Sequence, residues 1–505
     1  MAKTNRTPGI KKKVPIPFID NGNEGMSPSY DPSLLKNLYL IPKDTNSAAP
    51  YDMIAVRTPG TSFYLSTPNM EKIRGWYALN TQLYFVASNI VYSVGFSGVF
   101  VNIGTLTSFT SKVRMISNGS QIMLVDGIKG YVITIATNAF AAITDPDFVV
   151  PAPLQVEYHR GRGIYVTGDQ FYISDVNNFT SWQALNFASA EYDPQNLVGA
   201  VPVKNDLVLL GENITEIWTL TVDTVFPYVP KAGYIIMYGC QSITSVAEVD
   251  GVLVWMAKNK DGKNLLVALD SASMQLIAYE STQNLLSSLD ITNCVGKSIQ
   301  FNGHIFYYLY FPNENRSFLF DIKTKVLTEW HSWEISGYDS NGNAQYVLGR
   351  HLADEVIFWN NKSLISDYRS GTILELLPEL NVDYNAGVDN SIYYELRTSL
   401  LNINQQRYII DSFTIEMETG TSSVSLEESP TVDNLPIVEV AVSKDRGRTY
   451  PVVYETSVGY TGDYFEQVKI SKLGQCTNCC FKISGNHSSS VKLYNAVINI
   501  RLMDN

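Results

Sequence analysis

The chain contains few charged residues for its 505 positions, and those it has are mostly acidic. Charged side chains make up 17% of the sequence, with 37 Lys and Arg against 49 Asp and Glu, so the formal net charge is −12. A protein that grips nucleic acid replaces the counterions of the phosphates with basic side chains, so this balance argues against that mode of binding. An acidic wall would instead repel phosphates and let nucleic acid slide past without sticking.

Cysteine is scarce as well. The five cysteines are Cys240, Cys294, Cys476, Cys479 and Cys480. An odd number scattered through a long chain excludes a disulfide framework. We interpret Cys240 and Cys294 as small core residues.

Long apolar runs are missing. No stretch approaches the roughly 20 apolar residues that a membrane-spanning helix needs. Lys11–Lys13 form a basic patch near the start, but Pro15 and Pro17 interrupt the segment where a secretory signal has its apolar core. We therefore expect a protein made and folded in the cytosol, with no membrane partner.

Aromatic residues are abundant, and turn residues followed by apolar runs recur along the middle of the chain. Aromatics make up 12% of the sequence, including 31 Tyr, which favours β-structure. The repeat is anchored at Asn80, Asn118, Arg162, Asn205, Asp250, Asn302 and Asp354, at intervals of 38 to 52 residues. Such a period is typical of four-stranded propeller blades, each of which hides an apolar face against its neighbours. We predict six or seven blades, with a strand from Arg57–Leu65 closing the ring. The alternative is a large β-sandwich of unrelated hairpins.

The stretch Arg160–Leu220 shows two successive copies of this unit. In the first copy, Gly163 leads into IYVTG and QFYISD and the unit closes at Trp182, whereas Asn205–Asp206 leads into LVLLG and ENITEIW in the second. Gly, Asn and Asp tolerate the backbone angles of tight turns, so the stretch predicts antiparallel hairpins.

Composition divides the chain into three parts. Residues 1–56 are rich in Pro, Asn, Ser and Gly and predict an extended N-terminal arm with one short helix or strand in Ser33–Ile41. The arm either packs on the C-terminal domain or is a disordered terminus. Residues 57–380 hold the propeller repeat, and residues 381–505 contain alternating strands without a helical period, which indicates a β-sandwich. The predicted fold class is all-β, a six- or seven-bladed β-propeller plus a C-terminal β-sandwich (platform) domain.

One short motif, S-x-D-x-G-x-T-aromatic, resembles the Asp-box hairpin of sialidases and other β-proteins. Its residues are Ser443, Asp445, Gly447, Thr449 and Tyr450. In such a turn the Asp caps nearby N–H groups, the Gly takes a positive φ and the aromatic packs behind. These boxes are structural even in enzymes, so we predict a structural turn.

A second motif, CTNCC, offers thiol ligands. Cys476, Cys479 and Cys480 with His487 are the only metal candidates that we find. A lone CxxC is a weak zinc signal because a closed tetrahedral site needs four ligands. The competing interpretation is a hairpin turn with reduced thiols, and we predict no cofactor.

No catalytic pattern is complete. Gly161-Arg-Gly163 lacks the further glycine of a dinucleotide loop, and Gly296-Lys297-Ser298 lacks the first glycine of a phosphate loop. A glycosidase needs two paired carboxylates. The candidates around the opening repeat are Glu157, Asp169, Asp175, Glu191 and Asp193. Each is more simply a turn cap or a solvated residue, so we predict that the protein is not an enzyme.

The Arg160–Leu220 stretch also resembles a known family. The residues that carry the resemblance are Gly161, Gly163, Asp175, Trp182, Glu191, Pro194, Gly199 and Trp218. With Asn37-Leu-Tyr39, Arg57-Thr-Pro59-Gly60, Asp250–Trp255, the turn Asp445–Tyr450 and the ending Ile498–Leu502, this order is similar to the packaged-DNA stabilisation, or tail hub (nozzle), proteins of short-tailed double-stranded DNA phages. The basic N-terminal arm and the CTNCC cluster depart from the family pattern.

The resemblance implies a structural protein of the virion, assembled in the host cytoplasm. It implies a homohexameric ring below the portal and the tail adaptor protein, which retains packaged DNA and carries tailspikes or tail fibres and a tail needle or plug protein. Genomic double-stranded DNA would pass through an acidic lumen without specific binding. The alternatives are a propeller glycan hydrolase or receptor-binding tail protein, favoured by the Asp-box and the many Tyr and Trp, and a monomeric interaction scaffold.

Overall fold

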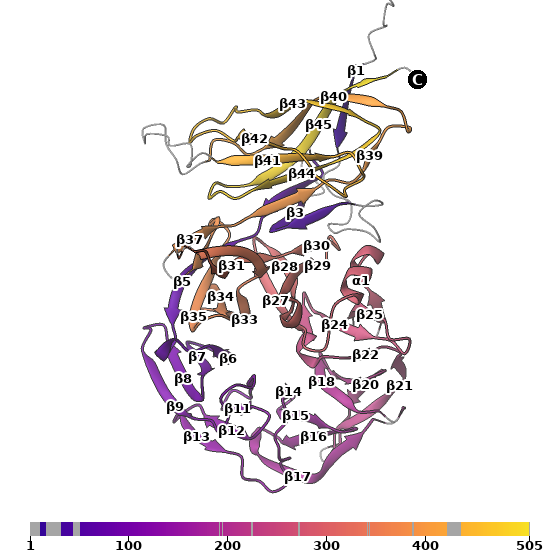
Figure 1. Cartoon of the computed structure of the whole chain (residues 1–505). Coiled ribbons are helices and arrows are strands. Elements are labelled where there is room, and N and C mark those ends of the chain that lie inside the picture. Colours follow the sequence, from indigo (N-terminus) through magenta and orange to yellow (C-terminus); the bar gives the residue numbers. More distant parts are fainter. Residues whose placement is uncertain are drawn as a thin grey trace, which may run out of the picture.

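The computed structural model describes residues 11–16, 32–43, 51–190, 192–193, 195–223, 226–270, 273–340, 342, 344–385, 388–421 and 436–503. Within these ranges the chain forms a ring of β-sheets with a two-sheet β-domain packed on one side of it (Figure 1). None of the helices among them is long and apolar enough to cross a membrane.

Seven antiparallel sheets among the described residues form the ring, so the predicted propeller is confirmed with seven blades. Blades 1 to 3 consist of β6 (Ile73–Leu79), β7 (Gln82–Ala87), β8 (Ile90–Gly95) and β9 (Phe100–Thr105); β10 (Arg114–Ser117), β11 (Gln121–Val125), β12 (Gly130–Thr134) and β13 (Ala139–Ala142); and β14 (Glu157–His159), β15 (Arg162–Thr167), β16 (Gln170–Asp175) and β17 (Asn178–Ser189).

Blades 4 to 7 follow the same pattern, with the first strand innermost. They consist of β18 (Leu197–Val203), β19 (Asp206–Gly211), β20 (Thr215–Leu220) and β21 (Tyr228–Ile236); β22 (Gly239–Cys240), β23 (Ala247–Val249), β24 (Val252–Lys258), β25 (Asn264–Asp270) and β26 (Ser273–Leu276); β27 (Val295–Phe301), β28 (His304–Phe311), β29 (Arg316–Asp321) and β30 (Leu327–Glu329); and β33 (Ala353–Trp359), β34 (Lys362–Asp367), β35 (Thr372–Leu377) and β5 (Gly60–Ser66).

The repeated turn residues lie where the innermost strand of a blade reverses into the second. Asn80, Asp250 and Asn302 all have positive φ there, a conformation that Asn and Asp tolerate better than other side chains. The anchor predicted at Asp354 is wrong, because this residue lies inside the innermost strand β33. The equivalent turn is Asn360–Asn361, displaced because a hairpin is inserted before blade 7.

The last blade is closed by a strand from far upstream. β5 pairs antiparallel with β35, from Gly60 opposite Leu377 to Ser66 opposite Thr372. A Cβ on Gly60 would lie 2.3 Å from the carbonyl oxygen of Val382, so only glycine fits this position. The ring is therefore completed by hydrogen bonds between the two ends of the propeller, as the sequence predicted from Arg57–Leu65.

Two hairpins and a few helical turns lie outside the blades. β31 (His331–Tyr338) and β32 (Ala344–Arg350) form a hairpin between blades 6 and 7, and β36 (Val382–Asn385) and β37 (Val388–Ser391) form another after blade 7. The helix α1 (Glu280–Ser287) connects blades 5 and 6, and short 3-10 turns span Pro68–Met70, Ile243–Ser245 and Pro312–Glu314.

The second domain is a β-sandwich that uses both ends of the chain. One sheet contains β1 (Lys11–Ile16), β3 (Leu38–Pro42), β4 (Met53–Arg57), β40 (Tyr408–Met417), β43 (Val468–Cys476) and β45 (Lys492–Leu502). The other contains β2 (Leu34–Lys36), β38 (Tyr394–Arg397), β39 (Leu401–Asn402), β41 (Ile437–Ser443), β42 (Val453–Ser457) and β44 (Asn478–Gly485). The strand β45 pairs with β1 and β4, so upstream residues complete the first sheet.

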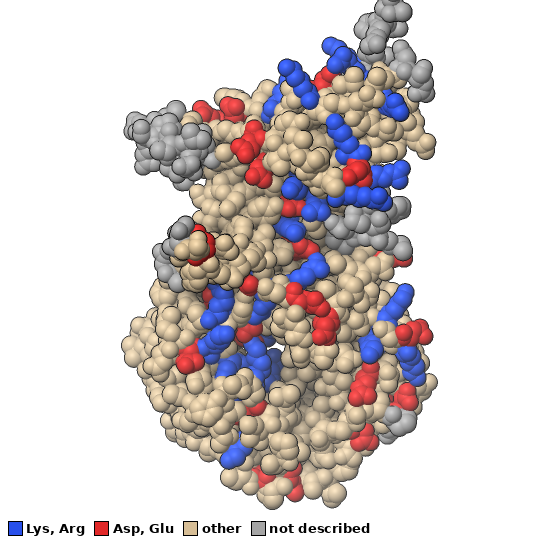
Figure 2. All heavy atoms as spheres, in the orientation of Figure 1, with Lys and Arg blue, Asp and Glu red and all other residues tan. Residues whose placement is uncertain are grey.

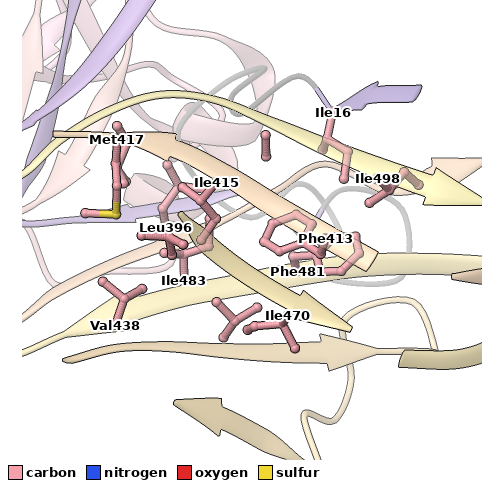
Figure 3. Close-up of a cluster of buried hydrophobic side chains, with 14 of the residues drawn as sticks. Ile16, Leu396, Phe413, Ile415, Met417, Val438, Ile470, Phe481, Ile483 and Ile498 are labelled. Atoms are coloured by element: carbon pink, nitrogen blue, oxygen red, sulfur yellow. The ribbon is translucent and has the colours of Figure 1, made fainter. Parts of the chain in front are cut away.

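An apolar core fills the space between these two sheets. The rings of Phe413 and Phe481 stack with centroids 4.1 Å apart, one from each sheet. Ile16 from β1 adds its side chain to the same core near Ile498 (Figure 3). The alternating apolar pattern of these strands thus places one face of each sheet inward.

Propeller and sandwich share one continuous sheet. Strand β2 pairs in parallel with β30 of blade 6, through Lys36 and Glu329, and antiparallel with β38 of the sandwich. The buried Asn37 side chain donates to the carbonyl oxygens of His331 and Tyr393 at 3.2 and 2.7 Å and accepts from the His331 N–H at 2.7 Å. An upstream segment therefore joins the two domains through backbone hydrogen bonds.

Arg57 is the second junction between the domains. Its buried guanidinium donates to the Asn381 side chain at 3.2 Å and to the carbonyl oxygens of Ile392, His487 and Ser489. Burial lowers the pKa of Arg57 to about 10, which still leaves it charged at neutral pH. One side chain thus connects the start of the propeller, its exit and the sandwich.

Candidate functional site

A cavity of 440 Å³ lies on the axis of the propeller, lined by residues of all seven innermost strands. Its charged lining side chains are Lys112, Arg114, Lys297, Glu157, Glu248 and Glu355. Figure 2 shows basic side chains gathered beside this central hollow, with acidic ones next to them. The cavity lining therefore carries equal numbers of basic and acidic groups.

Ion pairs join neighbouring and next-but-one blades across the cavity. Lys297 of blade 6 lies 2.7 Å from Glu355 of blade 7, and Lys112 at the start of blade 2 lies 3.4 Å from the same carboxylate. Arg114 of blade 2 and Glu157 of blade 3 are 2.6 Å apart. Burial raises the pKa of Glu355, but the Lys297 and Lys112 charges outweigh it and hold the pKa below its usual value. The carboxylate stays ionised and links three blades.

This arrangement does not suit nucleic acid. The basic side chains are already neutralised by carboxylates, so they do not offer free charge to phosphates. A 440 Å³ cavity has the size of a small-molecule site, and duplex DNA does not fit within it. Any DNA channel must therefore lie outside the single propeller.

The Asp-box residues form one tight turn between β41 and β42. The Asp445 carboxylate accepts hydrogen bonds from the Ser443 hydroxyl at 2.6 Å, the Thr449 N–H at 3.0 Å and the Thr449 hydroxyl at 2.6 Å. The Ser443 hydrogen bond, with those of Thr449, lowers the pKa of Asp445 to about 2. Gly447 has φ +84°, and its N–H donates to the Ser443 hydroxyl at 2.8 Å. The motif closes on itself, as a turn does.

The structure does not bring the four candidate metal ligands together. Cys476 and Cys479 lie side by side in the sandwich core, whereas Cys480 on the opposite face contacts the Tyr450 hydroxyl at 3.5 Å. His487 is 3.3 Å from the Tyr394 hydroxyl, and burial lowers its pKa to about 3. Within the described residues, no group of three or more His, Cys, Asp or Glu side chains could hold a metal ion.

The carboxylates proposed for glycoside hydrolysis are separately engaged. Glu157 pairs with Arg114, and Asp193 lies 3.2 Å from Lys260. Asp175 accepts hydrogen bonds from Ser181 at 2.6 Å and Gln183 at 2.8 Å, while Asp169 is exposed next to a turn. Glu191 lies outside the described residues. The contacts of Glu157, Asp175 and Asp193 are those of turn caps and surface ion pairs.

Comparison with known families covers both domains. Residues 14–380 match the family described as the β-propeller of bacteriophage P22 Gp10, a family of phage stabilisation proteins, and residues 393–501 match its β-sandwich.

The chain belongs to the P22 Gp10 family. It is therefore a phage stabilisation protein and a tail component, with the propeller and sandwich in the order that the sequence predicted. A comparison with curated proteins found no match.

Solved structures with related shape are distant. PorZ, an essential bacterial surface component of the type-IX secretion system of Porphyromonas gingivalis, is 10% identical over 67% of this chain with a TM-score of 0.34, and the match spans only 45% of PorZ. YCF48 from Cyanidioschyzon merolae is 9% identical (63% of this chain, 99% of that chain, TM-score 0.36), and the Neurospora crassa Pan2 WD40 domain is 7% identical (63% and 95%, TM-score 0.37). Likeness at this level says nothing of function.

The residues that carried the resemblance to this family have structural surroundings. Gly161 has φ +87° in the turn before β15, and a Cβ on Gly199 would lie 2.1 Å from the Ile243 side chain. The buried Trp182 donates its indole N–H to the Phe179 carbonyl at 2.9 Å, and Trp218 donates to Glu216 at 3.2 Å. Gly163 is the second residue of β15, and a Cβ there would lie 3.3 Å from the Phe179 ring. Glu191 and Pro194 lie outside the described residues.

Sequence reasoning missed the charges of the cavity. Lys112 and Arg114 are close in the sequence, but Lys297 and Glu355 are far from them and from each other. These charges meet only when the ring closes. Arg114 and Glu157 do share one local signal, because each begins the innermost strand of its blade. A comparison of the first strands of successive repeats would have shown these inward-facing charges.

Proposed function

We propose that six copies of this chain form the hub, or nozzle, ring of a short-tailed phage. The ring extends the DNA channel below the portal and the tail adaptor protein, helps to retain packaged DNA and anchors tailspikes or fibres and a tail needle. The observation that carries the proposal is the family match over both domains in the same order. The protein works as a non-enzymatic structural part of the virion.

Exposed apolar side chains on two opposite sides of the propeller are consistent with assembly into a ring. Beside blade 7 they are Phe63, Met70, Ile335, Tyr338 and Tyr346, on β5, a following turn and the inserted hairpin. Beside blade 4 they are Val229 and Tyr234 on β21, with Val222 before this strand and Met237 just after it. The outer strands of blades 4 and 7 lie on opposite sides of the ring of blades, as Figure 1 shows for β21 and β5.

Two different apolar surfaces on opposite sides are what a cyclic assembly needs. In a closed ring each subunit contacts its neighbours through two unlike surfaces, and exposed apolar side chains are typical of the centre of such an interface. We therefore assign the blade 7 side and the blade 4 side to successive subunits.

The DNA passage then lies between the copies. Since the propeller cavity is too small for a duplex, the lumen is bounded by outer surfaces of six subunits. With a net charge of −12 per chain, we expect this lumen to be net acidic, which lets DNA leave without binding.

Native mass spectrometry of the purified full-length protein, alone and with the tail adaptor protein, tests the proposal. We expect a six-copy assembly in at least one of these samples. A chain that stays monomeric in both would overturn it and favour the interaction scaffold. Electron microscopy of the ring then shows which residues line the lumen. A lining with net positive charge would contradict the predicted acidic passage.

A further inference from the structure

The chain crosses between the two sheets of the sandwich at Cys476–Cys479. Cys476 ends β43 in one sheet, opposite Tyr408 of β40, and Cys479 lies at the start of β44 in the other sheet, opposite Leu401. Only Thr477 and Asn478 separate the two cysteines. One thiol therefore belongs to each sheet at the corner of the sandwich.

The two thiols face each other inside the core. Both side chains belong to the apolar cluster between the sheets, and both lie beside Tyr408, which is opposite Cys476 in its sheet. The Tyr408 hydroxyl lies 3.3 Å from the Cys479 sulfur and also contacts Cys476. Cys480 points to the opposite face, toward Tyr450, so it is not part of the pair.

The surroundings make the two thiols chemically unequal. The hydrogen bond from Cys479 lowers the pKa of Cys476 and burial raises it. The Tyr408 hydroxyl and the Lys444 charge also lower it, so the net direction is downward. The same hydrogen bond, with burial, raises the pKa of Cys479. Cys476 is also the more accessible of the two, with 7% of its surface exposed against 0% for Cys479. Since an accessible thiolate is the reacting form of cysteine, Cys476 is the nucleophile of the pair.

The two cysteines of the propeller have the opposite character. Burial raises the pKa of Cys240 and of Cys294 to about 12. The Cys240 thiol donates its proton in a hydrogen bond to the Ser242 carbonyl oxygen at 3.2 Å. These thiols are inert, structural groups and serve as internal controls for the CTNCC motif.

We propose that Cys476 and Cys479 form a redox site that closes into a disulfide when the protein meets a low-molecular-weight disulfide oxidant. The Cys476 thiolate attacks one sulfur of the oxidant, forms a mixed disulfide and releases one small thiolate. The Cys479 thiol loses its proton and attacks the Cys476 sulfur, which releases the second small thiol. The protein gives up two electrons and two protons, and the oxidant is reduced to two thiols.

The bond would join the two sheets at the corner where the chain passes between them. It closes a loop of only four residues, so the expected gain in stability is small. Its larger effect is local, because it fixes the end of β43 against the start of β44. The CTNCC motif is one of the departures from the family pattern noted in the sequence.

The test uses the full-length protein, purified under reducing conditions and then incubated with oxidised glutathione. After denaturation and alkylation of the remaining thiols, mass spectrometry should find one internal disulfide, three alkylated cysteines and a cross-linked peptide joining Cys476 to Cys479. Five alkylated cysteines at an oxidant concentration that oxidises a reference dithiol would overturn the proposal. A bond to Cys480, or one between Cys240 and Cys294, would also overturn it.

Two variants separate the pair from its neighbour. We expect Cys480→Ser to form the same bond as the wild type, because Cys480 points away. We expect Cys479→Ser to stop at the mixed disulfide on Cys476, with one glutathione added per chain. Circular dichroism establishes that each variant is folded, and the wild-type peptide map decides the question if a variant is not. A Cys479→Ser protein that is folded and carries no glutathione would contradict the role given to Cys476.

Discussion

The propeller and the sandwich are both all-β, but they are built from contacts of very different range. Within blades 1 to 6 most strands pair with the next strand along the chain, and in blade 5 both β22 and β23 pair with β24. Only two blades pair with upstream strands among the described residues, because β30 of blade 6 pairs with β2 and β35 of blade 7 pairs with β5. In the sandwich, strands from residues 11–57 pair with strands from residues 394–502. Local pairing leaves a period in the sequence, whereas distant pairing leaves none, so the two domains differ in how much of their structure the sequence reveals.

All seven tryptophans of the chain lie before residue 360, so tryptophan fluorescence follows the propeller side and not the sandwich. Hydrogen exchange follows both. The two measurements together show whether a change acts in one domain or crosses the shared sheet.

The largest effect is expected from Phe413→Ala in the sandwich. Removing a fully buried ring that stacks on Phe481 should lower the free energy of unfolding by about 3–5 kcal/mol. Urea denaturation followed by hydrogen exchange should show the loss in strands β40–β45. The fluorescence midpoint should move less than it does in Phe85→Ala, a matched change in the core of blade 1. Equal fluorescence shifts in the two variants would show that the domains unfold as one.

Arg57→Leu should affect both domains at once. The substitution removes donors to Asn381, Ile392, His487 and Ser489 and leaves buried carbonyl groups without partners, at a cost of about 2–4 kcal/mol. We expect the fluorescence and exchange midpoints to fall together. Loss confined to the sandwich would show that Arg57 does not couple the domains.

The ionisation of Asp383 should be visible in the pH dependence of stability. Asp383 is on β36, and its carboxylate lies between Thr61 of β5 and Ser332 of β31. Burial raises the pKa of Asp383 to about 6, although the Ser332 and Thr61 hydroxyls donate to it at 2.8 and 3.3 Å. A raised carboxyl pKa means that the folded state binds more protons than the unfolded state between about pH 4 and 6, so this group makes stability fall as pH rises through that window.

Asp383→Asn should therefore raise the free energy of unfolding at pH 8 by about 1–2 kcal/mol and change it little at pH 4. Chemical denaturation at the two pH values measures the difference. A gain of equal size at both would mean that ionisation is not its cause. Glu329 at the shared sheet makes stability depend on pH in the opposite direction. Burial raises its pKa, but His331, Arg316 and Lys36 outweigh burial and lower the pKa to about 2. Its contribution is present above pH 4.5 and is lost as the pH falls toward 2.

The smallest effect is expected at the Asp-box. Asp445→Ala removes three hydrogen bonds of an exposed turn and should cost about 1 kcal/mol or less. Hydrogen exchange should rise in residues 443–450 and stay unchanged in the propeller. A loss as large as that of Phe413→Ala would mean that the turn supports the sandwich core.

The sequence predicted what is local. Turn residues such as Asn80 and Asn302 located the blades, the ring-closing strand was found near Gly60, and the Asp-box turn followed from its side chains. The anchor at Asp354 failed because the β31–β32 hairpin lengthens the repeat before blade 7. Pairings such as Lys36 with Glu329, and the ion pairs of Glu355, depend on ring closure and domain packing, which no short stretch of sequence encodes. The boundaries at residues 56 and 380 stay predictions.

The adjacency of β5 and β35 means that the chain enters and leaves the propeller at nearly the same place. Gly60 lies opposite Leu377, so the blades form a closed ring that begins and ends next to the sandwich. The two sequences that flank the ring build that sandwich. In topological terms the propeller is an insertion within the sandwich sequence. Such an insertion leaves the two flanking sequences side by side, so that together they complete one sandwich.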